Sequence, residues 1–434
     1  ISGHGSFRSA DGNYPFTLVN GNQTSEETRS NNDYTDYHFG LTSGIKKGKS
    51  VIRLGYMQKE FDQGLPGAVI LYNNSADERM ENRDQNLFGD YVFKGNKTSL
   101  RSFIKINENH MNYTDPNYLG QNGGIDISYR NRSIQAGIAG ENKLTENLKI
   151  HFGVEEVISD LLVSDTTFAS PLRYHNYAIL GLKYKFSKRF NLSLQLSEQF
   201  IKENNSAGIS AENKFKINPY IEFSTKDERQ KFGHKIWYRS SFRMPTFNEL
   251  YYNNIGNVEL KPEEAHQMNY GWSYSPKKYR NFQFYFRNNI YLNYVNNKIV
   301  AIPTKNLFTW SMQNVQSANI FGTDFKIGSK WNVYKYLKFD IDLNYSLQHA
   351  RDISDPNSPS YKDQIAYIPV HTGNIDLAIN YKNLGIRFSN YTNSLRYALN
   401  ENISTNQVDG FWVSTLSTYY SVILKNKNTL TFRF

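Results

Sequence analysis

The sequence contains no cysteine among its 434 residues. Disulfide scaffolds and thiolate metal sites are therefore excluded, and the chain suits an oxidising compartment such as a periplasm. The sequence also lacks any run of about 18 apolar residues, which excludes membrane-spanning helices. No secretory signal peptide is visible at Ile1, so we expect the chain to be mature or trimmed at this end.

Several signatures of catalysis and metal binding are missing as well. The nine histidines never occur at an H-x₃-H or HExxH spacing, so no metal site is expected. Asp352, Asp355 and Asn357 could ligate calcium, but a solvated acidic loop is the preferred interpretation. Because there is no GxSxG elbow, Walker loop or dinucleotide fingerprint, we expect neither an enzyme nor a cofactor. A barrel lipase with lipid-facing Ser and His residues stays a remote alternative.

Charge and hydropathy limit the remaining classes. The net charge is +10, from 50 Lys and Arg against 40 Asp and Glu. The basic residues are scattered, so we expect no nucleic-acid partner. Only 39% of the residues are hydrophobic and the mean hydropathy is −0.64. Aromatic residues nevertheless reach 15%, with 32 Tyr and 28 Phe. This combination suits a membrane β-barrel, in which alternate residues face lipid and aromatic girdles lie at the interfaces.

Long segments alternate apolar and polar residues, as in 337–346 and 190–196. Period-two alternation puts one set on each face of a strand. The polar face carries charges that a soluble core would not accept, so we expect lipid on one side and water or polar filling on the other. The expected lipid-facing residues include Leu192, Leu194, Leu337, Phe339, Ile341, Leu343, Ile375, Leu377 and Ile379. The expected lumen-facing residues include Lys338, Asp340, Asp342 and Asp376.

Short polar turns and longer connections follow one another along the whole chain. The nine short turns are centred on Lys46, Lys94, Asn147, Lys188, Lys226, Lys277, Tyr334, Lys382 and Asn426. The longer connections are 20–33, 61–83, 110–123, 159–172, 202–211, 243–263, 296–308, 350–365 and 397–409. Short periplasmic turns and long extracellular loops are typical of outer-membrane barrels. A β-propeller repeats at a similar length but needs four short strands per repeat, whereas each repeat here has two long ones.

The turns predict an all-β fold, an antiparallel transmembrane β-barrel with about nineteen strands in this chain. Nine turns flank eighteen strands, and one further strand lies near Ile1–Phe7. Bacterial single-chain barrels have an even number of strands. We therefore expect the barrel domain, residues 1–434, to be incomplete at both ends. Edge strands Ile1–Phe7 and Asn428–Phe434 would then lack a partner on one side.

Residues 240–267, SSFRMPTFNELYYNNIGNVELKPEEAHQ, contain a recognisable motif. The segment resembles the "FRAPT..EL…GN..LKPE" pattern of TonB-dependent outer-membrane receptors, with Met244 in place of the commoner alanine. The matching positions are Arg243, Pro245, Thr246, Glu249, Leu250, Gly256, Asn257, Leu260, Lys261, Pro262 and Glu263. Segments 314–327 and 363–374 are similar to two further segments of the family, and they occur in the family's order.

The residues of this motif predict a loop base. Pro245 and Pro262 would stop ladder pairing where one strand leaves the sheet and where the chain returns to it. Gly256 and Asn257 would supply positive-φ turn chemistry between the two prolines. We therefore expect the motif to shape a loop before it contacts any ligand.

Two kinds of side-chain contact are expected at the long loops. Arg243 and Glu263 lie at the two strand ends of the motif and are expected to pair. Aromatic faces suit bulky organic metal complexes, so loop tyrosines are the candidate ligand-binding residues. These candidates are Tyr72, Tyr113, Tyr118, Tyr251 and Tyr252.

The resemblance implies a larger protein. Barrels of this family have about 22 strands and a plugged lumen. We therefore expect this sequence to lack the N-terminal plug, its energy-coupling segment, two opening strands and the closing strand. The resemblance implies a receptor in the outer membrane of a Gram-negative bacterium, surrounded by outer-membrane lipid. Its partners would be the TonB complex, reached through the plug segment, and a surface lipoprotein.

The ligand implied by the resemblance is a scarce, bulky metal-organic nutrient. Haem-binding members place a histidine between the two halves of the motif, and residues 247–256 contain none. A ferric siderophore or cobalamin is therefore favoured. The rival interpretation is a plugless diffusion porin, because the visible chain contains no plug.

Overall fold

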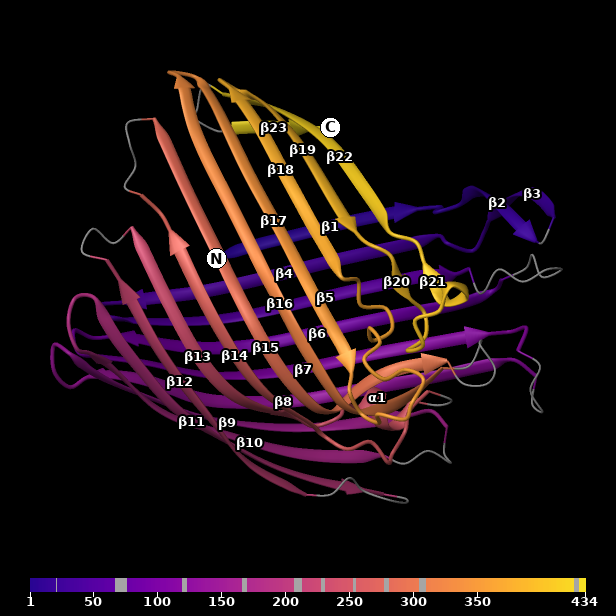
Figure 1. Ribbon diagram of the computed structural model, residues 1–434, viewed down its shortest axis with the longest axis horizontal. Helices are drawn as coiled ribbons and strands as arrows, with labels where there is room; N and C mark the ends of the chain where they lie inside the picture. The colour runs from indigo at the N-terminus through magenta and orange to yellow at the C-terminus, as the bar shows by residue number, and fades with distance from the viewer. Residues whose placement is uncertain are drawn as a thin grey trace. The chain divides into compact units, whose positions relative to one another are not determined.

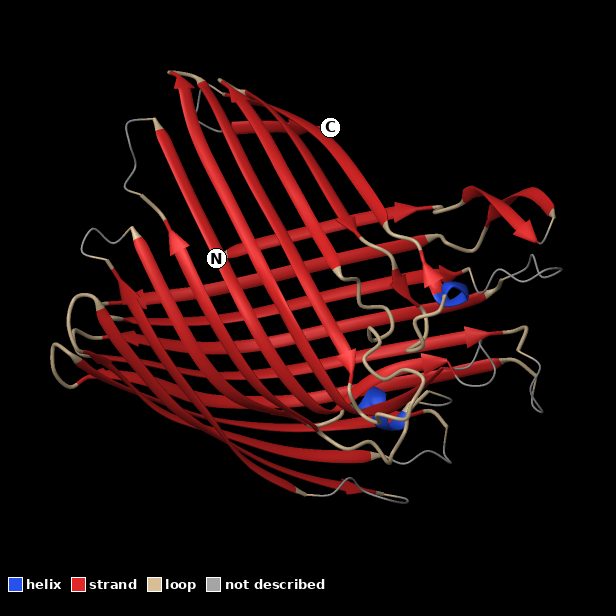
Figure 2. Cartoon of the chain, in the orientation of Figure 1, coloured by secondary structure: helices blue, strands red, loops and turns tan. Residues whose placement is uncertain are grey.

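The computed structural model describes residues 1–20, 22–66, 76–118, 123–165, 170–206, 213–227, 231–252, 255–276, 281–303, 310–424 and 429–434. The chain divides into two compact units. Unit 1 contains Ile1–Gly181 and Ser197–Ile217, and unit 2 contains Leu182–Leu196 and Asn218–Phe434. Strands dominate the described chain (Figures 1 and 2), as the alternating sequence predicts.

Unit 1 is built on an antiparallel ladder. Its strands are β1 (Ser2–Ala10), β2 (Tyr14–Asn20), β3 (Gln23–Arg29), β4 (Tyr34–Lys47), β5 (Ser50–Leu65), β6 (Glu78–Lys94), β7 (Thr98–Asp115), β8 (Ile125–Lys143) and β9 (Leu148–Val163). In the ladder β1 pairs with β4, and each strand from β4 to β9 pairs with the next. Strands β10 (Pro171–Lys185), β11 (Phe190–Asn205) and β12 (Lys214–Lys226) contribute residues to both units.

The longer connection predicted at 20–33 lies between β1 and β4 and contains strand structure that was not predicted. Strands β2 and β3 pair as a hairpin that covers most of this connection. Phe16 and Leu18 alternate with polar residues, which is a strand pattern that continues past the end of β1. The long connection therefore has regular structure of its own.

Unit 2 is a second antiparallel ladder. Besides most of β12, it contains β13 (Phe232–Arg243), α1 (Phe247–Tyr251), β14 (Glu263–Tyr274), β15 (Phe282–Pro303), β16 (Trp310–Tyr334), β17 (Leu337–Asp352), β18 (His371–Tyr381), β19 (Leu384–Asn393), β20 (Arg396–Tyr397), η1 (Ser404–Asn406), β21 (Gln407–Val408), β22 (Phe411–Ile423) and β23 (Thr429–Arg433). Each strand from β12 to β19 pairs with the next, followed by β22 and β23. The short strands β20 and β21 pair within the predicted connection 397–409.

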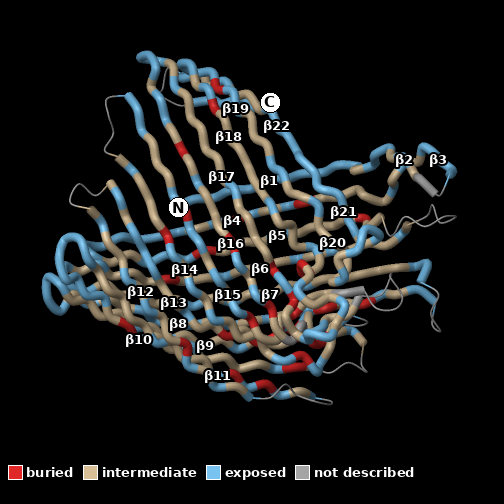
Figure 3. The backbone as a smooth tube through the Cα atoms, viewed as in Figure 1, coloured by how far each residue is buried: buried red, intermediate tan, exposed pale blue. Residues whose placement is uncertain are grey.

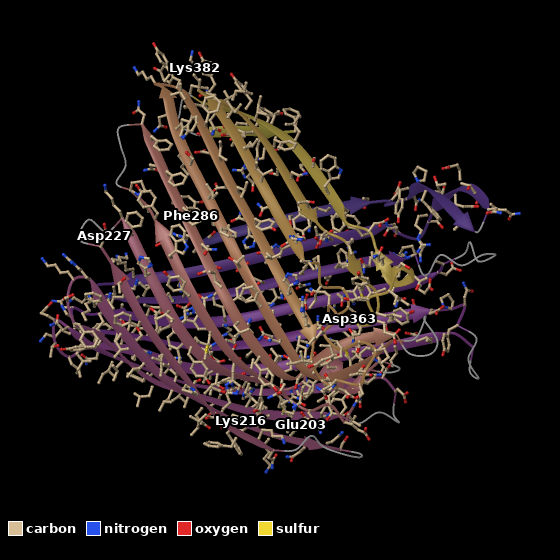
Figure 4. The ribbon with its side chains drawn as sticks, in the orientation of Figure 1. Glu203, Lys216, Asp227, Phe286, Asp363 and Lys382 are labelled. Carbon is tan, nitrogen blue, oxygen red and sulfur yellow. The ribbon has the colours of Figure 1, made fainter. Side chains whose placement is uncertain are left out.

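The predicted short turns fall at junctions between consecutive strands, although Lys46, Lys94, Lys226 and Tyr334 belong to the ends of the strands themselves. Two turn centres, Lys277 and Asn426, lie outside the described residues. Lys382 has a φ of 51°, so its backbone closes the β18–β19 turn in the left-handed region. Figure 4 shows Lys382 at one end of the unit 2 strands and Asp363, in a long connection, at the other. The predicted separation of short turns and long loops is therefore confirmed in unit 2.

The strand count also agrees with the prediction. Among the described residues, nineteen strands are assigned to the main sheet. Strands β15 and β16 contain 22 and 25 residues. A tilted strand needs only about 9–11 residues to cross a bilayer. The β15–β16 hairpin therefore extends well beyond a membrane.

The register separates the predicted lipid-facing and lumen-facing residues of β17 and β18. Ile341 is paired with Leu377, whereas Asp342 is paired with Asp376. Directly paired residues share a face, and successive residues alternate between faces. The two predicted sets therefore lie on opposite faces of the ladder. On β11, Leu192 and Leu194 have the same parity as Leu196, whose side chain is exposed.

Buried residues of unit 2 gather around α1 (Figure 3). A further buried cluster lies at the long-loop ends of β15 to β17. Its members are Val295, Ala318, Ala350 and Ile365. No helix among the described residues is long and apolar enough to cross a membrane.

Candidate functional site at the base of the motif segment

Residues 244–262, which we call the motif segment, connect β13 to β14. An ion pair joins the two strand ends from which the segment leaves and to which it returns. Arg243 ends β13, Glu263 begins β14, and the two are register partners. The Arg243 Nε donates to Glu263 Oε2 at 2.9 Å, so the predicted pair is present. An Arg243 terminal nitrogen donates to Glu249 in α1 at 2.8 Å. One guanidinium therefore joins both strand ends of the loop to its helix.

The second oxygen of Glu263 connects this pair to the next strand. Glu263 Oε1 accepts from Lys298 Nζ at 3.0 Å and from the Ile299 backbone N–H at 2.8 Å. The four charged groups, Arg243, Lys298, Glu249 and Glu263, balance to zero. This balance matters because the Glu249 and Glu263 side chains are only 17% and 13% exposed. Buried charges are tolerated when they are paired and hydrogen-bonded. We call these four residues the charge cluster.

The helix α1 begins with a capping box. The Thr246 hydroxyl accepts from the Glu249 backbone N–H at 3.3 Å, and the Glu249 carboxylate accepts from the Thr246 N–H at 2.7 Å. This reciprocal pair satisfies donors that would otherwise be unpaired at the first turn. Burial alone would raise the pKa of Glu249, but hydrogen bonds from Arg243 and Thr246 outweigh burial and lower this pKa. Glu249 is therefore held as a carboxylate.

The apolar residues of the motif are buried in and around α1. Phe247, Leu250 and Leu260 are buried, and Pro245 is almost completely so. Met244, where the family more often has alanine, is buried as well and contributes its larger side chain to this packing. The ladder ends between the two prolines as predicted: pairing of β13 with β14 stops at Arg243 and Glu263, next to the buried Pro245 and the half-buried Pro262.

The predicted positive φ at Gly256 and Asn257 is wrong, because neither residue lies in that region. Gly256 is needed for space instead. A Cβ atom placed on it would lie 2.8 Å from the Leu250 carbonyl carbon and oxygen. Asn257 acts through hydrogen bonds: its N–H donates to Glu249 O at 2.8 Å and its side-chain amide donates to Met312 O at 3.1 Å. These contacts fasten the loop to the end of α1 and to β16.

The sequence did not predict that the β15–β16 hairpin holds the end of the motif segment through Asn314. Asn314 Oδ1 accepts from the Lys261 N–H at 2.8 Å, and its side-chain amide donates to Lys261 O at 3.0 Å. The same amide donates to the carbonyl of Asn297, a residue with a φ of 53°. Asn314 opens the second segment that resembles the family, so this resemblance was the signal that could have identified it.

The third family-like segment, 363–374, forms another anchored loop base. The Gln364 side chain accepts from the Ala350 N–H at 3.0 Å and donates to Gln348 O at 3.2 Å and Ile368 O at 3.1 Å. Asn402 accepts from the Gln364 N–H at 2.6 Å. The predicted loops 350–365 and 397–409 are thus held together by one buried glutamine.

Backbone strain accompanies this second loop base. Lys362 and Tyr367 have φ values of 68° and 61°, which are uncommon for residues with side chains. Ile365 lies between them and is 1% exposed. The buried packing and the Gln364 hydrogen bonds hold the loop in a conformation that its sequence alone would not prefer.

The candidate ligand-binding tyrosines lie in different environments. Tyr118 is 47% exposed, and Tyr113 is half-buried on β7 between Met80 and Ile127. Tyr252 is half-buried at the end of α1, whereas Tyr251 is only 5% exposed and packs against Phe247. Tyr72 lies outside the described residues. Binding by these tyrosines stays a prediction, and burial makes Tyr251 the least accessible described member.

The described residues contain no group of three or more His, Asp or Glu side chains that could hold a metal ion. In the loop considered for calcium, Asp352 accepts from the Ser354 N–H at 2.9 Å and Asp355 accepts from the Asn357 N–H at 2.9 Å. These carboxylates therefore stabilise the loop's own turns.

Comparison with known proteins decides the family. The family model described as "TonB dependent receptor-like, beta-barrel" matches residues 3–434. The chain belongs to this family. The fold class predicted from the sequence, an antiparallel β-barrel of the TonB-dependent receptor type, is thereby confirmed. Members of this family are receptors and transporters.

Solved structures share this fold at low sequence identity. The FrpB iron transporter from Neisseria meningitidis (F3-3 variant) is 14% identical, with a TM-score of 0.69 over 96% of this chain and 70% of that chain. The siderophore receptor PiuA from Acinetobacter baumannii is 13% identical, with a TM-score of 0.70 over 99% of this chain and 76% of that chain. The copper transporter OprC is 13% identical, with a TM-score of 0.67 over 96% and 71%. No curated protein matches the chain.

Proposed function

We propose that this TonB-dependent receptor imports a scarce, bulky metal-organic nutrient across the outer membrane of a Gram-negative bacterium. The match of the family model to residues 3–434 carries this proposal. In such a barrel the apolar face of the strands contacts outer-membrane lipid and the polar face lines the lumen. A barrel this wide needs a plug, and moving a plug needs work from the inner membrane. The partner that supplies this work is the TonB complex, acting through the plug segment.

The anchored loop bases support a receptor more than a simple pore. The charge cluster, the Asn314 contacts and Gln364 fix the roots of long loops that would otherwise be free to move. Loops with fixed roots lose less conformational entropy when they close on a ligand, which favours tight capture before transport. A surface lipoprotein that contacts these loops is a further proposed partner.

We favour a ferric siderophore over haem as the ligand, with cobalamin as the second candidate. Residues 247–256 contain no histidine that could ligate a haem iron. Two of the similar structures are named as an iron transporter and a siderophore receptor. The exposed Tyr118 and the half-buried Tyr113 and Tyr252 offer aromatic faces to a bulky organic complex.

The deciding experiment measures uptake by the full-length protein in cells that lack their own siderophore and cobalamin receptors. Radiolabelled ferric siderophores and cobalamin are supplied with and without an uncoupler of the proton-motive force. Saturable uptake that stops on uncoupling supports the receptor and identifies the ligand. Energy-independent entry of unrelated small solutes would favour the diffusion porin. Hydrolysis of lipid by the purified barrel would favour the lipase.

A further inference from the structure

Two histidines and a methionine of unit 1 gather on the polar face of β1, β4 and β5 (Figure 1). On β4, Phe39 belongs to the apolar face and is 52% exposed, so its neighbours His38 and Gly40 lie on the polar face. Gly40 is the register partner of His4 on β1 and of Met57 on β5. These three residues therefore form one row on the face that lines the lumen of such a barrel, and His38 lies in the next row.

The glycine in this row leaves room for an imidazole ring. A Cβ atom on Gly40 would lie 2.6 Å from Nε2 of His4, so the His4 ring lies over β4. The ring centroids of His4 and His38 are 4.9 Å apart, with an interplanar angle of 63°. An imidazole nitrogen binds zinc at about 2.0–2.1 Å, which places the centroids of two imidazoles on one tetrahedral ion about 5 Å apart. The two rings therefore have the spacing of imidazoles that share one metal ion.

Met57 can supply a third ligand from the other side of Gly40. Neighbouring strands lie about 4.8 Å apart, and the unbranched methionine side chain is flexible enough to bring its sulfur over the glycine. The resulting ligand set is two imidazoles and a thioether. It therefore differs from the groups of three His, Asp or Glu side chains that the described residues lack.

The imidazole nitrogens of this cluster are available to a metal ion. The rings of His234 and His266 are hydrogen-bonded to tyrosine hydroxyls at 2.9 and 2.8 Å. Within the part of the chain that the structure describes, neither His4 nor His38 has a side-chain hydrogen bond, and the two rings contact each other. A neutral imidazole offers one unprotonated nitrogen as a ligand.

The nearest cations on the same face are engaged elsewhere. Lys59 is the register partner of His38, but its ammonium lies 5.3 Å from the ring centroid of Phe61, one row farther toward the long loops. In that same row Arg8 is paired with Asp36. A metal cation at the cluster would therefore meet little electrostatic repulsion from these side chains.

We propose that His4, His38 and Met57 form a copper site on the lumen-facing wall of unit 1. Thioethers are soft ligands that select Cu(I), and imidazoles suit copper as well. Zinc sites use imidazole, thiolate and carboxylate ligands instead, so copper is favoured over zinc. The site needs the barrel fold of the family but not the nutrient proposed above. It would hold a copper ion without an organic carrier.

The test measures Cu(I) binding by the purified full-length protein. The chelator bicinchoninate, whose copper complex is coloured, competes for the metal under anaerobic, reducing conditions. One site variant is His4→Gln/His38→Gln, which removes both imidazoles. The other is Met57→Leu, which removes the sulfur and keeps a similar side-chain volume.

Each site variant has a matched control. His234→Gln/His266→Gln removes two imidazoles from unit 2. Met111→Leu removes a thioether from the same face of unit 1 as Met57, on β7. Both controls should bind Cu(I) as the wild type does, because the copper site is intact in them.

Both site variants should bind Cu(I) more weakly than the wild type. Loss of even an indirect partner of a metal ligand lowers metal affinity by about 10–100-fold. We therefore expect a loss of about 100-fold in the double histidine variant and of about tenfold in Met57→Leu. X-ray absorption by protein loaded with one equivalent of Cu(I) should show nitrogen and sulfur ligands, and the sulfur ligand should be absent in Met57→Leu.

Equal losses in a site variant and its control, or a wild-type spectrum without a sulfur ligand, would overturn the proposal. If the double variant fails to fold, His38→Gln against His234→Gln makes the same comparison. Copper binding is measured without nutrient or proton-motive force, so it is independent of uptake. Nutrient uptake without copper binding would refute the copper site alone, and copper binding without energy-dependent nutrient uptake would refute the proposed function alone.

Discussion

Replacement of Arg243 by methionine should lower the local stability of the motif segment where it joins β13 and β14. The side chain makes hydrogen bonds of 2.9 Å to Glu263 and of 2.8 and 3.1 Å to Glu249. Methionine keeps much of the packing volume but removes the guanidinium from both carboxylates, and Lys298 then contacts Glu263 only. Removing one partner of a buried pair costs about 3–5 kcal/mol, whereas an exposed pair contributes about 0–1 kcal/mol. Arg243 is 40% exposed and its partners are mostly buried. We therefore expect a local loss of about 2 kcal/mol.

Hydrogen exchange measures this loss directly. The N–H of Asn257 donates to Glu249 O, and the N–H of Ile299 donates to the Glu263 carboxylate. A loss of about 2 kcal/mol should accelerate exchange of both amides about 30-fold. Amides in the middle of β13 and β14 should change little, because the ladder itself is intact.

The matched control is Arg239→Met, on the same strand and the same face. Arg239 is exposed and donates to the neutral side chain of Gln267 at 2.7 Å. We expect its exchange effect to be below about 0.5 kcal/mol. Equal acceleration in the Arg239 and Arg243 variants would refute the idea that the charge cluster anchors the segment. A large effect confined to Arg243 would support it.

Three further predictions test the segment and the membrane register. Because the folded-state pKa of Glu249 is lowered, its stabilisation is present above the ordinary glutamate pKa and is lost as the pH falls through the folded value. Protection of α1, corrected for intrinsic exchange, should therefore decline as the pH falls below the ordinary glutamate pKa of 4.5, and Glu249→Gln should flatten this decline. Gly256→Ala should destabilise the motif segment by about 1–3 kcal/mol through contact with the backbone of α1, as judged by denaturant unfolding. Gly373→Ala, whose new Cβ would meet its nearest atom at 3.4 Å, should cost less, and the reverse order would contradict the packing argument. Ile341→Arg should lower the unfolding free energy in lipid by about 2–4 kcal/mol at the membrane midplane, and a similar loss for Asn344→Arg on the polar face would show that the register is wrong.

The sequence by itself determined the architecture, because strand periodicity and turn chemistry are local. Alternation within 337–346 predicted which residues share a face, and pairing of Ile341 with Leu377 and of Asp342 with Asp376 confirms it. Polar turn residues marked the strand ends, since a reversal of direction needs residues that tolerate tight backbone conformations. The family motif placed Arg243 opposite Glu263 before any contact was known.

Only the tertiary structure decided how the loop bases are held. Asn314 lies more than 50 residues beyond Lys261 in the chain, and the sequence has no local signal that the two exchange hydrogen bonds. Gly256 is required because the Leu250 backbone passes close to it, and not because of its own φ. Tyr251 reads as an exposed loop aromatic in the sequence, yet packing of α1 buries it. Each outcome depends on contacts between segments that are distant in sequence, and such contacts produce no periodic pattern in the sequence.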